Sequence, residues 1–309
     1  MTLQQMEYIV AVYRTRHFAK AAEACGVTQP TLSAMVQKLE QELDIKIFER
    51  SPQQVVPTPI GRLVVEQAWK VLLRAKKIKE IVAEEKRSTA GSLRIGILPT
   101  IAPYLLPRFF SQMQAGNPQL EMKVLEMKTS EMKRAIDKGE IDAGIMVNVE
   151  DLENYQKITL FYEQFMGYVA ENDPIFEKNT IKISDLSKEF LWLLDEGHCF
   201  RNQMVKFCQL KSASLSQSSY SLGSIETFMR MVESGKGMTF IPELALTQLT
   251  AEQKRLVRPF AIPIPTREVI LALSKSYVRF SVIELLANNI RSCVPEYMLR
   301  FNNTGQRIL

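Results

Sequence analysis

The chain has 309 residues, of which 46% are hydrophobic and 24% charged, so it is long enough for two or three domains and is not a disordered protein. It contains no apolar run near the roughly 20 residues of a membrane span. Its first residues have neither the basic region nor the apolar region of a secretory signal, so we expect a cytoplasmic protein. Residues 1–90 hold +4 of the net charge of +5, which favours an N-terminal module that meets a polyanion.

The cysteines exclude a disulfide framework, because four in a chain of this length are too few. There is no CxxC pair and there are only two histidines, so we expect neither a structural metal site nor another cofactor. Any disulfide that forms in a reducing compartment is expected to be regulatory and transient. The cysteines are Cys25, Cys199, Cys208 and Cys293.

Residues 1–50 are predicted to form three short helices. The second apolar stripe ends at Gly26, and a third helix begins at the N-cap Thr28, carries Pro30 in its first turn and runs to about Leu43. Two helices joined by a short glycine-containing turn predict a helix-turn-helix. Residues 45–56 are predicted to form a small β-wing. The first helix is marked by an apolar stripe of Leu3, Tyr8, Ile9 and Val12.

The third helix is the candidate DNA-recognition helix. We expect Leu32, Val36 and Leu39 to face inward, which leaves short polar side chains near a helix N-terminus that favours phosphate. The alternative is an ordinary solvated helix. Arg50 and Arg62 are candidates for DNA-backbone contacts or plain surface charges. The outward residues proposed for DNA binding are Gln29, Pro30, Thr31, Ser33, Gln37 and Lys38.

A long helix is predicted over residues 59–87, after the cap-and-proline pair Thr58-Pro59. Its apolar residues follow a heptad spacing, which favours a helix–helix dimer over packing on the N-terminal module. The predicted dimer seam consists of Val64, Ala68, Val71, Ala75, Ile78 and Val82.

After a small polar hinge at residues 88–92, the pattern changes to alternating strands and helices. The polar tail after Phe301 is expected to fray. Strands are predicted at 93–98, 120–127, 141–147, 190–194, 238–241 and 269–274, and helices at 103–113, 130–137, 224–233 and 281–292. Residues 161–170 are expected to cross into a second α/β unit.

Several motifs resemble the LysR-type transcriptional regulators over essentially the whole chain. They are Phe18–Ala22, Gln29–Ser33, Lys38–Leu43, Thr58–Gly61 and Val232–Gly237 followed by Ile241-Pro242. The resemblance implies an α/β protein that binds promoter DNA as a dimer or tetramer, contacts RNA polymerase and is not an enzyme. The wing departs from the family, because Gln53 and Gln54 replace basic residues and reduce the expected phosphate contacts.

The same resemblance implies three parts. A winged helix-turn-helix would occupy residues 1–58, and a linker or dimerisation helix with a hinge would occupy 59–90. Residues 91–309 would form an effector domain of two periplasmic-binding-protein-like subdomains, with subdomain I at about 91–163 and 269–309 and subdomain II at about 164–268.

The segment around Cys199 carries reactive chemistry on residue type alone. His198 and Arg201 flank Cys199, and positive or proton-accepting neighbours stabilise a thiolate. Cys208 lies in an apolar stretch and is expected to be buried. The alternative is that both cysteines are small core residues.

Gly197–Gln203 with Cys208, and Leu98–Pro107, are similar to the hydrogen-peroxide-sensing members of the family. That similarity implies that Cys199 is peroxidatic, that Cys208 resolves it as a disulfide, that a cellular dithiol system reduces the bond, and that antioxidant genes are controlled. Asn202 stands where those members have an acid. The peroxide-pocket residues implied are Thr100, Thr129, His198, Arg201 and Arg267; the two threonines could equally cap helices.

Helical geometry supports a switch. If residues 200–208 are helical, the cysteines lie about 13 Å apart along the axis, whereas a disulfide needs Cα atoms within about 7 Å. The bond therefore requires this segment to unwind. Two other functions stay open: a regulator that reads a small metabolite in the cleft with incidental cysteines, and a peroxide-reducing enzyme or solute-binding protein.

Overall fold

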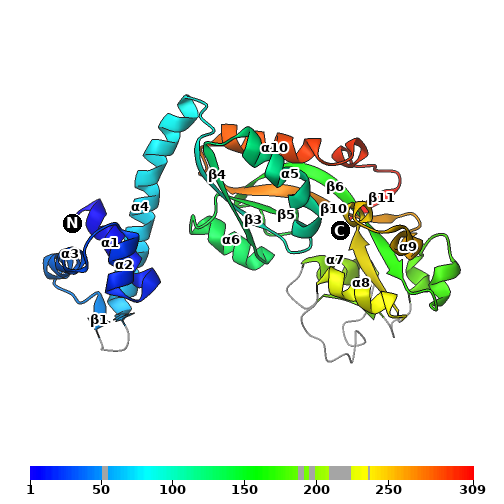
Figure 1. Cartoon of the computed structure of the whole chain (residues 1–309), viewed down its shortest axis with the longest axis horizontal. Helices are drawn as coiled ribbons and strands as arrows, with labels where there is room; N and C mark the ends of the chain where they lie inside the picture. The colour runs from blue at the N-terminus through cyan, green and yellow to red at the C-terminus, as the bar shows by residue number, and fades with distance from the viewer. Residues whose placement is uncertain (51–54, 187–190, 195–198, 209–223, 236) are drawn as a thin grey trace. The chain divides into compact units, whose positions relative to one another are not determined.

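The computed structural model describes residues 1–309 except 51–54, 187–190, 195–198, 209–223 and 236, and for Arg50 and Cys199 it describes the backbone alone. Gln53, Gln54 and His198 therefore lie outside the described residues. The chain divides into two compact units, Met1–Lys86 and Arg87–Leu309 (Figure 1). Among the helices described, none is long and apolar enough to cross a membrane.

The N-terminal unit is three helices, a two-stranded hairpin and a long helix. Thr28 and Thr58 cap the third and fourth helices as predicted, and His17 caps the second through Nδ1. Of the apolar stripe of the first helix, Tyr8, Ile9 and Val12 are buried, and Leu3 is 48% exposed. The elements are α1 (Leu3–Thr15), α2 (Phe18–Ala24), α3 (Gln29–Glu42), β1 (Phe48–Arg50), β2 (Val55–Pro57) and α4 (Pro59–Glu85).

A buried carboxylate joins α3 to the hairpin. Glu40 Oε1 accepts from the backbone N–H groups of Ile47 at 2.8 Å and Phe48 at 3.2 Å. A buried carboxylate is costly unless it is hydrogen-bonded, and these amides meet that need. β1 pairs antiparallel with β2, so Glu40 fixes the hairpin against the end of α3.

The start of α4 is built on a close approach of two backbones. A Cβ at Gly61 would lie 2.0 Å from the carbonyl oxygen of Ile47, so only glycine fits there. Thr58 Oγ1 accepts from the Gly61 amide at 2.9 Å and donates to the carbonyl of Lys46 at 2.7 Å. These contacts tie α4 to the strand that enters the hairpin.

α4 presents two apolar faces. Val65 and Ala68 are buried in the core of the N-terminal unit, with Val64 partly buried beside them. Three residues of the predicted seam, Val71, Ile78 and Val82, are exposed, and Ala75 is half-buried. The exposed apolar residues of α4 are Ile60, Leu63, Val71, Ile78, Ile81 and Val82.

The second unit is a mixed sheet of strands covered by helices. Its strands are β3 (Gly91–Ile97), β4 (Leu120–Glu126), β5 (Ala143–Val147), β6 (Tyr155–Val169), β7 (Leu191–Trp192), β8 (Met238–Pro242), β9 (Val257–Pro259), β10 (Ile264–Ser274) and β11 (Gln306–Ile308). Its α-helices are α5 (Ala102–Gly116), α6 (Thr129–Asp137), α7 (Cys199–Phe207), α8 (Ile225–Glu233), α9 (Ala251–Arg255) and α10 (Phe280–Ser292). Its 3-10 helices are η1 (Pro174–Glu177), η2 (Ile183–Asp185), η4 (Glu243–Thr247) and η5 (Glu296–Leu299).

The strand order is β4-β3-β5-β10-β6-β8-β7, with β11 on β10 and β9 on β6. β6 passes between two groups of strands: its first half pairs with β10, and Phe165–Val169 pairs with β8. α5 packs beside α10, and α6 packs against β5 (Figure 1). β6 and β10 therefore form the crossover between two subdomains, and residues near their pairing at Glu163 and Arg267 lie at that crossover.

The prediction of a frayed tail was wrong. Gln306–Ile308 forms β11, which pairs parallel with β10, and the Leu309 amide donates to the carbonyl of Thr266 at 3.1 Å. Backbone pairing needs no apolar pattern, so these polar residues gave no strand signal.

Candidate functional site

The recognition face of α3 is exposed, as the pattern predicts. Leu32, Val36 and Leu39 are fully buried. Ser33 is half-buried, and Thr28 Oγ1 accepts from the Thr31 amide at 3.4 Å. Exposed on this helix are Gln29, Pro30, Thr31, Gln37 and Lys38, and Arg62 is exposed on α4.

A buried ion pair lies where β6 and β10 cross. Arg267 and Glu163 are each 1% exposed or less, and Glu163 Oε2 accepts from Arg267 Nε at 2.8 Å and forms an ion pair with Nη2 at 2.6 Å. The other carboxylate oxygen accepts from the Leu244 amide at 2.9 Å. Arg267 Nη1 donates to Thr100 Oγ1 at 3.2 Å, and Nη2 donates to the Thr100 carbonyl at 3.1 Å. The structure thus brings the predicted pocket residues Thr100 and Arg267 into direct contact.

Packing connects α7 to this ion pair. The Phe200 ring, one residue after Cys199, meets the Phe165 ring edge-on at 4.9 Å between centroids. The Arg267 guanidinium lies over the same Phe165 ring at 5.3 Å from its centroid. Two aromatic rings therefore link the N-terminal turn of α7 to Arg267.

The tail makes a second link between α7 and β10. Gln203 Nε2 donates to the carbonyl of Leu309 at 3.1 Å, and the Leu309 amide donates to Thr266, the neighbour of Arg267. Gln203 is 7% exposed, and its Oε1 has no hydrogen-bond partner among the described residues.

Cys208 continues the helical hydrogen bonding of α7 through its amide, which donates to the Met204 carbonyl at 2.9 Å. Its side chain is 4% exposed, which confirms the expected burial. Burial raises the pKa of the Cys208 thiol to about 12. At neutral pH this thiol is therefore protonated and shielded from reagents.

The remaining pocket candidates are placed apart. Arg201 Nη1 donates to the Leu194 carbonyl at 3.1 Å. Thr129 lines a cavity of about 690 Å³ together with Asn202 and Gln203 of α7. Within the described part of the chain, no hydrogen bond or ion pair joins Arg201 or Thr129 to Arg267. Neither Thr100 nor Thr129 occupies an N-cap: Ile101 precedes α5, and Lys128 precedes α6.

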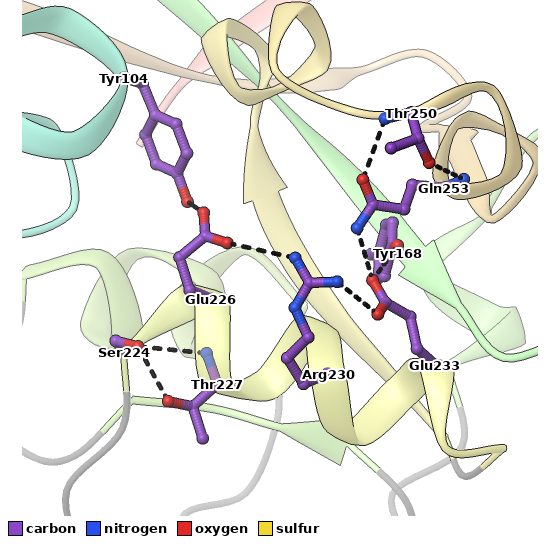
Figure 2. Close-up of polar contacts among 9 residues, drawn as sticks. All are labelled: Tyr104, Tyr168, Ser224, Glu226, Thr227, Arg230, Glu233, Thr250 and Gln253. Carbon is purple, nitrogen blue, oxygen red and sulfur yellow. Dashed lines mark hydrogen bonds and ion pairs between the residues drawn. The ribbon is translucent and has the colours of Figure 1, made fainter. Parts of the chain in front are cut away.

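A polar network crosses the subdomains on the side of α8 (Figure 2). The buried Tyr104 of α5 donates through its hydroxyl to Glu226 Oε1 at 2.8 Å. Burial and the facing Glu226 carboxylate raise the pKa of Tyr104 far above its ordinary value. Further along α8, Glu233 accepts from Arg230 at 2.6 Å and from Tyr168 at 2.7 Å. Hydrogen bonds from Tyr168, Gln253 and Arg230 hold the pKa of Glu233 below its usual range against desolvation, which raises it.

Metal chemistry has no evident donor set in the residues that can be described, since no three His, Cys, Asp or Glu side chains gather there.

The fold and the exposed recognition helix define a class: a winged helix-turn-helix joined by a long helix to a two-subdomain α/β domain. The family models agree, because residues 3–62 match the bacterial regulatory helix-turn-helix protein of the lysR family and residues 86–292 match the LysR substrate binding domain. The chain belongs to the LysR family of bacterial transcriptional regulators, as its motifs predict, and the predicted fold class is confirmed.

Among curated proteins the chain is similar to a hydrogen peroxide-inducible genes activator of Dickeya chrysanthemi, with 34% identity over 298 residues that cover 96% of this chain and 97% of that protein. It is 34% identical over 292 residues to the DNA-binding transcriptional dual regulator OxyR of Escherichia coli K12, covering 94% and 95% of the two chains.

Solved structures agree with this assignment. A full-length OxyR from Pseudomonas aeruginosa matches with a TM-score of 0.77 and 36% identity, covering 97% of this chain and 100% of that chain. OxyR from Porphyromonas gingivalis is 46% identical, with a TM-score of 0.66, over 71% of this chain and 99% of that chain. The resemblance to the peroxide-sensing members is thereby confirmed as homology.

Sequence reasoning missed Glu163, Gln203 and Leu309. Glu163 had a usable signal, because it alternates with Phe161 and Phe165, and alternate residues of a strand share one face. A charge at such a position must be paired, so a buried cation was to be expected. Gln203 and Leu309 gave no comparable signal.

Proposed function

We propose that this chain is a DNA-binding transcription regulator that senses hydrogen peroxide by reversible formation of a Cys199–Cys208 disulfide and controls antioxidant genes. The observation that carries the proposal is that α7 begins at Cys199 and its hydrogen bonding continues to Cys208, in a chain homologous to peroxide-inducible gene activators. Residues 1–58 would bind promoter DNA, 59–90 would dimerise, and 91–309 would sense the oxidant.

The chemistry has two balanced steps. The Cys199 thiolate attacks one peroxide oxygen, the O–O bond breaks, and the other oxygen leaves as hydroxide and takes a proton to become water. The Cys208 thiol then attacks the Cys199 sulfenic sulfur; the S–S bond forms, and the sulfenic oxygen leaves with the thiol proton as a second water. Thr100, Thr129, His198, Arg201 and Arg267 would line the peroxide pocket.

Helix geometry makes the second step a conformational switch. Nine residues of α-helix separate the two Cα atoms by about 13 Å, far beyond the roughly 7 Å that a disulfide spans. The buried Cys208 must therefore leave its site and α7 must unwind before the bond forms. The oxidised form has a remodelled subdomain, which would change packing between effector domains and re-space the DNA-binding heads.

The regulator would act on DNA as a dimer or tetramer. An isolated helix that exposes Leu63, Val71 and Ile78 leaves apolar surface in water, which a second copy of α4 would cover. Ala68 of the predicted seam would then pack in the N-terminal core, and the residues from Val71 to Val82 would pack against the second copy. The regulator would contact RNA polymerase, would be reset by a cellular dithiol reductant and would act in the cytoplasm. We infer no enzymatic turnover, since one peroxide is consumed per oxidation.

Replacement of Cys199 by serine tests this function. Cys199→Ser should retain operator binding and lose the peroxide-dependent change in transcription, whereas Cys25→Ser, at a cysteine on the other unit, should behave as wild type. A normal peroxide response in Cys199→Ser would refute the sensor assignment. Cys208→Ser should accumulate sulfenic acid without an intramolecular disulfide, as read by mass spectrometry.

A second candidate is a small-molecule effector in the cavity beside Thr129. Two features favour this alternative: the cavity volume of about 690 Å³, and Gln203 Oε1 on its wall, which has no hydrogen-bond partner in the part of the chain that is described. A metabolite that raises the melting temperature of the Cys199→Ser, Cys208→Ser double variant and changes its DNA binding would support it over peroxide sensing.

A further inference from the structure

We infer that Glu163 is a positioning residue for the peroxide reaction: it fixes the Arg267 guanidinium and, through it, the Thr100 hydroxyl as two aimed hydrogen-bond donors. The inference rests on the proposed function, because it concerns the leaving oxygen of the peroxide. Nothing in the motifs assigns a role to Glu163.

Burial makes the arrangement rigid. Glu163 and Arg267 oppose each other directly in the β6–β10 register, and both are at most 1% exposed. One carboxylate oxygen of Glu163 accepts from Arg267 and the other accepts from the Leu244 amide. The carboxylate therefore cannot rotate without losing a buried hydrogen bond. The orientation of Arg267 is therefore fixed by Glu163, whose own position is fixed by the Leu244 amide.

The direction of each hydrogen bond follows from the donor inventory. A guanidinium has five N–H donors, of which Nε donates to Glu163, one on Nη2 donates to the Thr100 carbonyl, and one on Nη1 donates to Thr100 Oγ1. Among the described residues, one Nη1 donor is left over. Because Thr100 Oγ1 accepts from Arg267, its own hydrogen is free to donate elsewhere.

Two fixed donors suit the chemistry of peroxide cleavage. When the thiolate attacks one oxygen, negative charge develops on the departing oxygen, and fixed donors stabilise that charge most at the transition state. The Phe165 and Phe200 rings connect this donor pair to the first turn of α7, where Cys199 lies.

Glu163 also decides how Arg267 acts. A carboxylate 2.6 Å from Nη2 neutralises the guanidinium, so Arg267 acts through oriented N–H groups and little through net charge. The two modes predict opposite outcomes when Glu163 loses its charge. Orientation predicts a slower peroxide reaction, whereas net charge predicts a more stable Cys199 thiolate and faster reaction with every electrophile.

The test compares two electrophiles at Cys199 in the full-length reduced protein, by quench and peptide mass spectrometry. With Glu163→Gln we expect the rate with hydrogen peroxide to fall about 100-fold, as for loss of an oriented donor. The rate with iodoacetamide, which has no departing peroxide oxygen, should stay within about threefold. Asp142→Asn, which breaks the Arg94–Asp142 pair of 2.8 Å in the same unit, is the matched control and should change neither rate.

Removal of a buried charge can prevent folding, so Glu163→Asp is the second variant. It keeps the charge and shortens the side chain, and we expect a selective loss with peroxide of about tenfold. Unchanged peroxide rates in the folded variants, or equal acceleration with both reagents, would overturn the inference. If wild-type Cys199 fails to react with peroxide at all, the proposed function fails instead.

Discussion

The buried Cys208 thiol should resist alkylation until α7 opens. In a variant with Cys25, Cys199 and Cys293 replaced by serine, Cys208 is the one thiol left. Its pKa of about 12, against an ordinary value of 9.0, lowers its thiolate fraction about 1000-fold at any pH well below both values. We therefore expect iodoacetamide to label the native variant at least about 1000-fold more slowly than the same chain in denaturant.

The pH dependence has a defined sign. Because folding raises the pKa of Cys208, the thiol stabilises the folded state fully below pH 9 and loses that contribution as pH rises toward 12. The native labelling rate should accordingly rise about tenfold per pH unit through pH 9 without a plateau, as long as the chain stays folded. Native labelling within tenfold of the denatured rate, or a plateau near pH 9, would refute the burial of Cys208.

Three further outcomes follow from other contacts. Gly61→Ala should lower the stability of the N-terminal unit by about 1–3 kcal/mol in thermal unfolding, because its Cβ meets the Ile47 carbonyl, whereas Gly116→Ala has open space and should not destabilise. Ile78→Glu on the exposed face of α4 should weaken self-association in sedimentation without unfolding the unit; an unchanged assembly would contradict the proposed dimer. Tyr104→Phe should cost the second unit about 1–3 kcal/mol, because the half-buried Glu226 loses its donor, and an unchanged melting temperature would show that water replaces the hydroxyl.

The sequence predicted helices well where the residues at the helix N-terminus themselves mark its first turn. Thr28 and Thr58 cap α3 and α4 because a threonine followed by proline satisfies the first turn without help from distant residues. The family motifs then predicted the order of the two units, which the fold and the homologues confirm.

Signals that depend on distant partners were read less well. Ala68 fits a heptad seam, yet packing in the core of its own unit buries it, and a periodicity does not say which partner covers it. β6 begins at Tyr155, six residues before the segment 161–170 that was expected to cross between units, because pairing with β10 extends it. β7 is two residues, Leu191–Trp192, and position 190 of the predicted strand lies outside the described residues.

The candidate site was predicted in part for the same reason. Thr100 and Arg267 came from motif resemblance, but their mutual hydrogen bond depends on a crossover between strands far apart in sequence. Glu163 shows what physical reading adds, since a charge among inward aromatic residues requires a buried partner.

Hydrogen exchange of the α7 amides, before and after one equivalent of hydrogen peroxide, tests the central claim most directly. In the thiol form, the amides from Gln203 to Cys208 should be protected by helical hydrogen bonds. When mass spectrometry finds the Cys199–Cys208 bond in the same sample, those amides should exchange as in an unfolded segment. Unchanged protection in molecules that contain the disulfide would contradict the account.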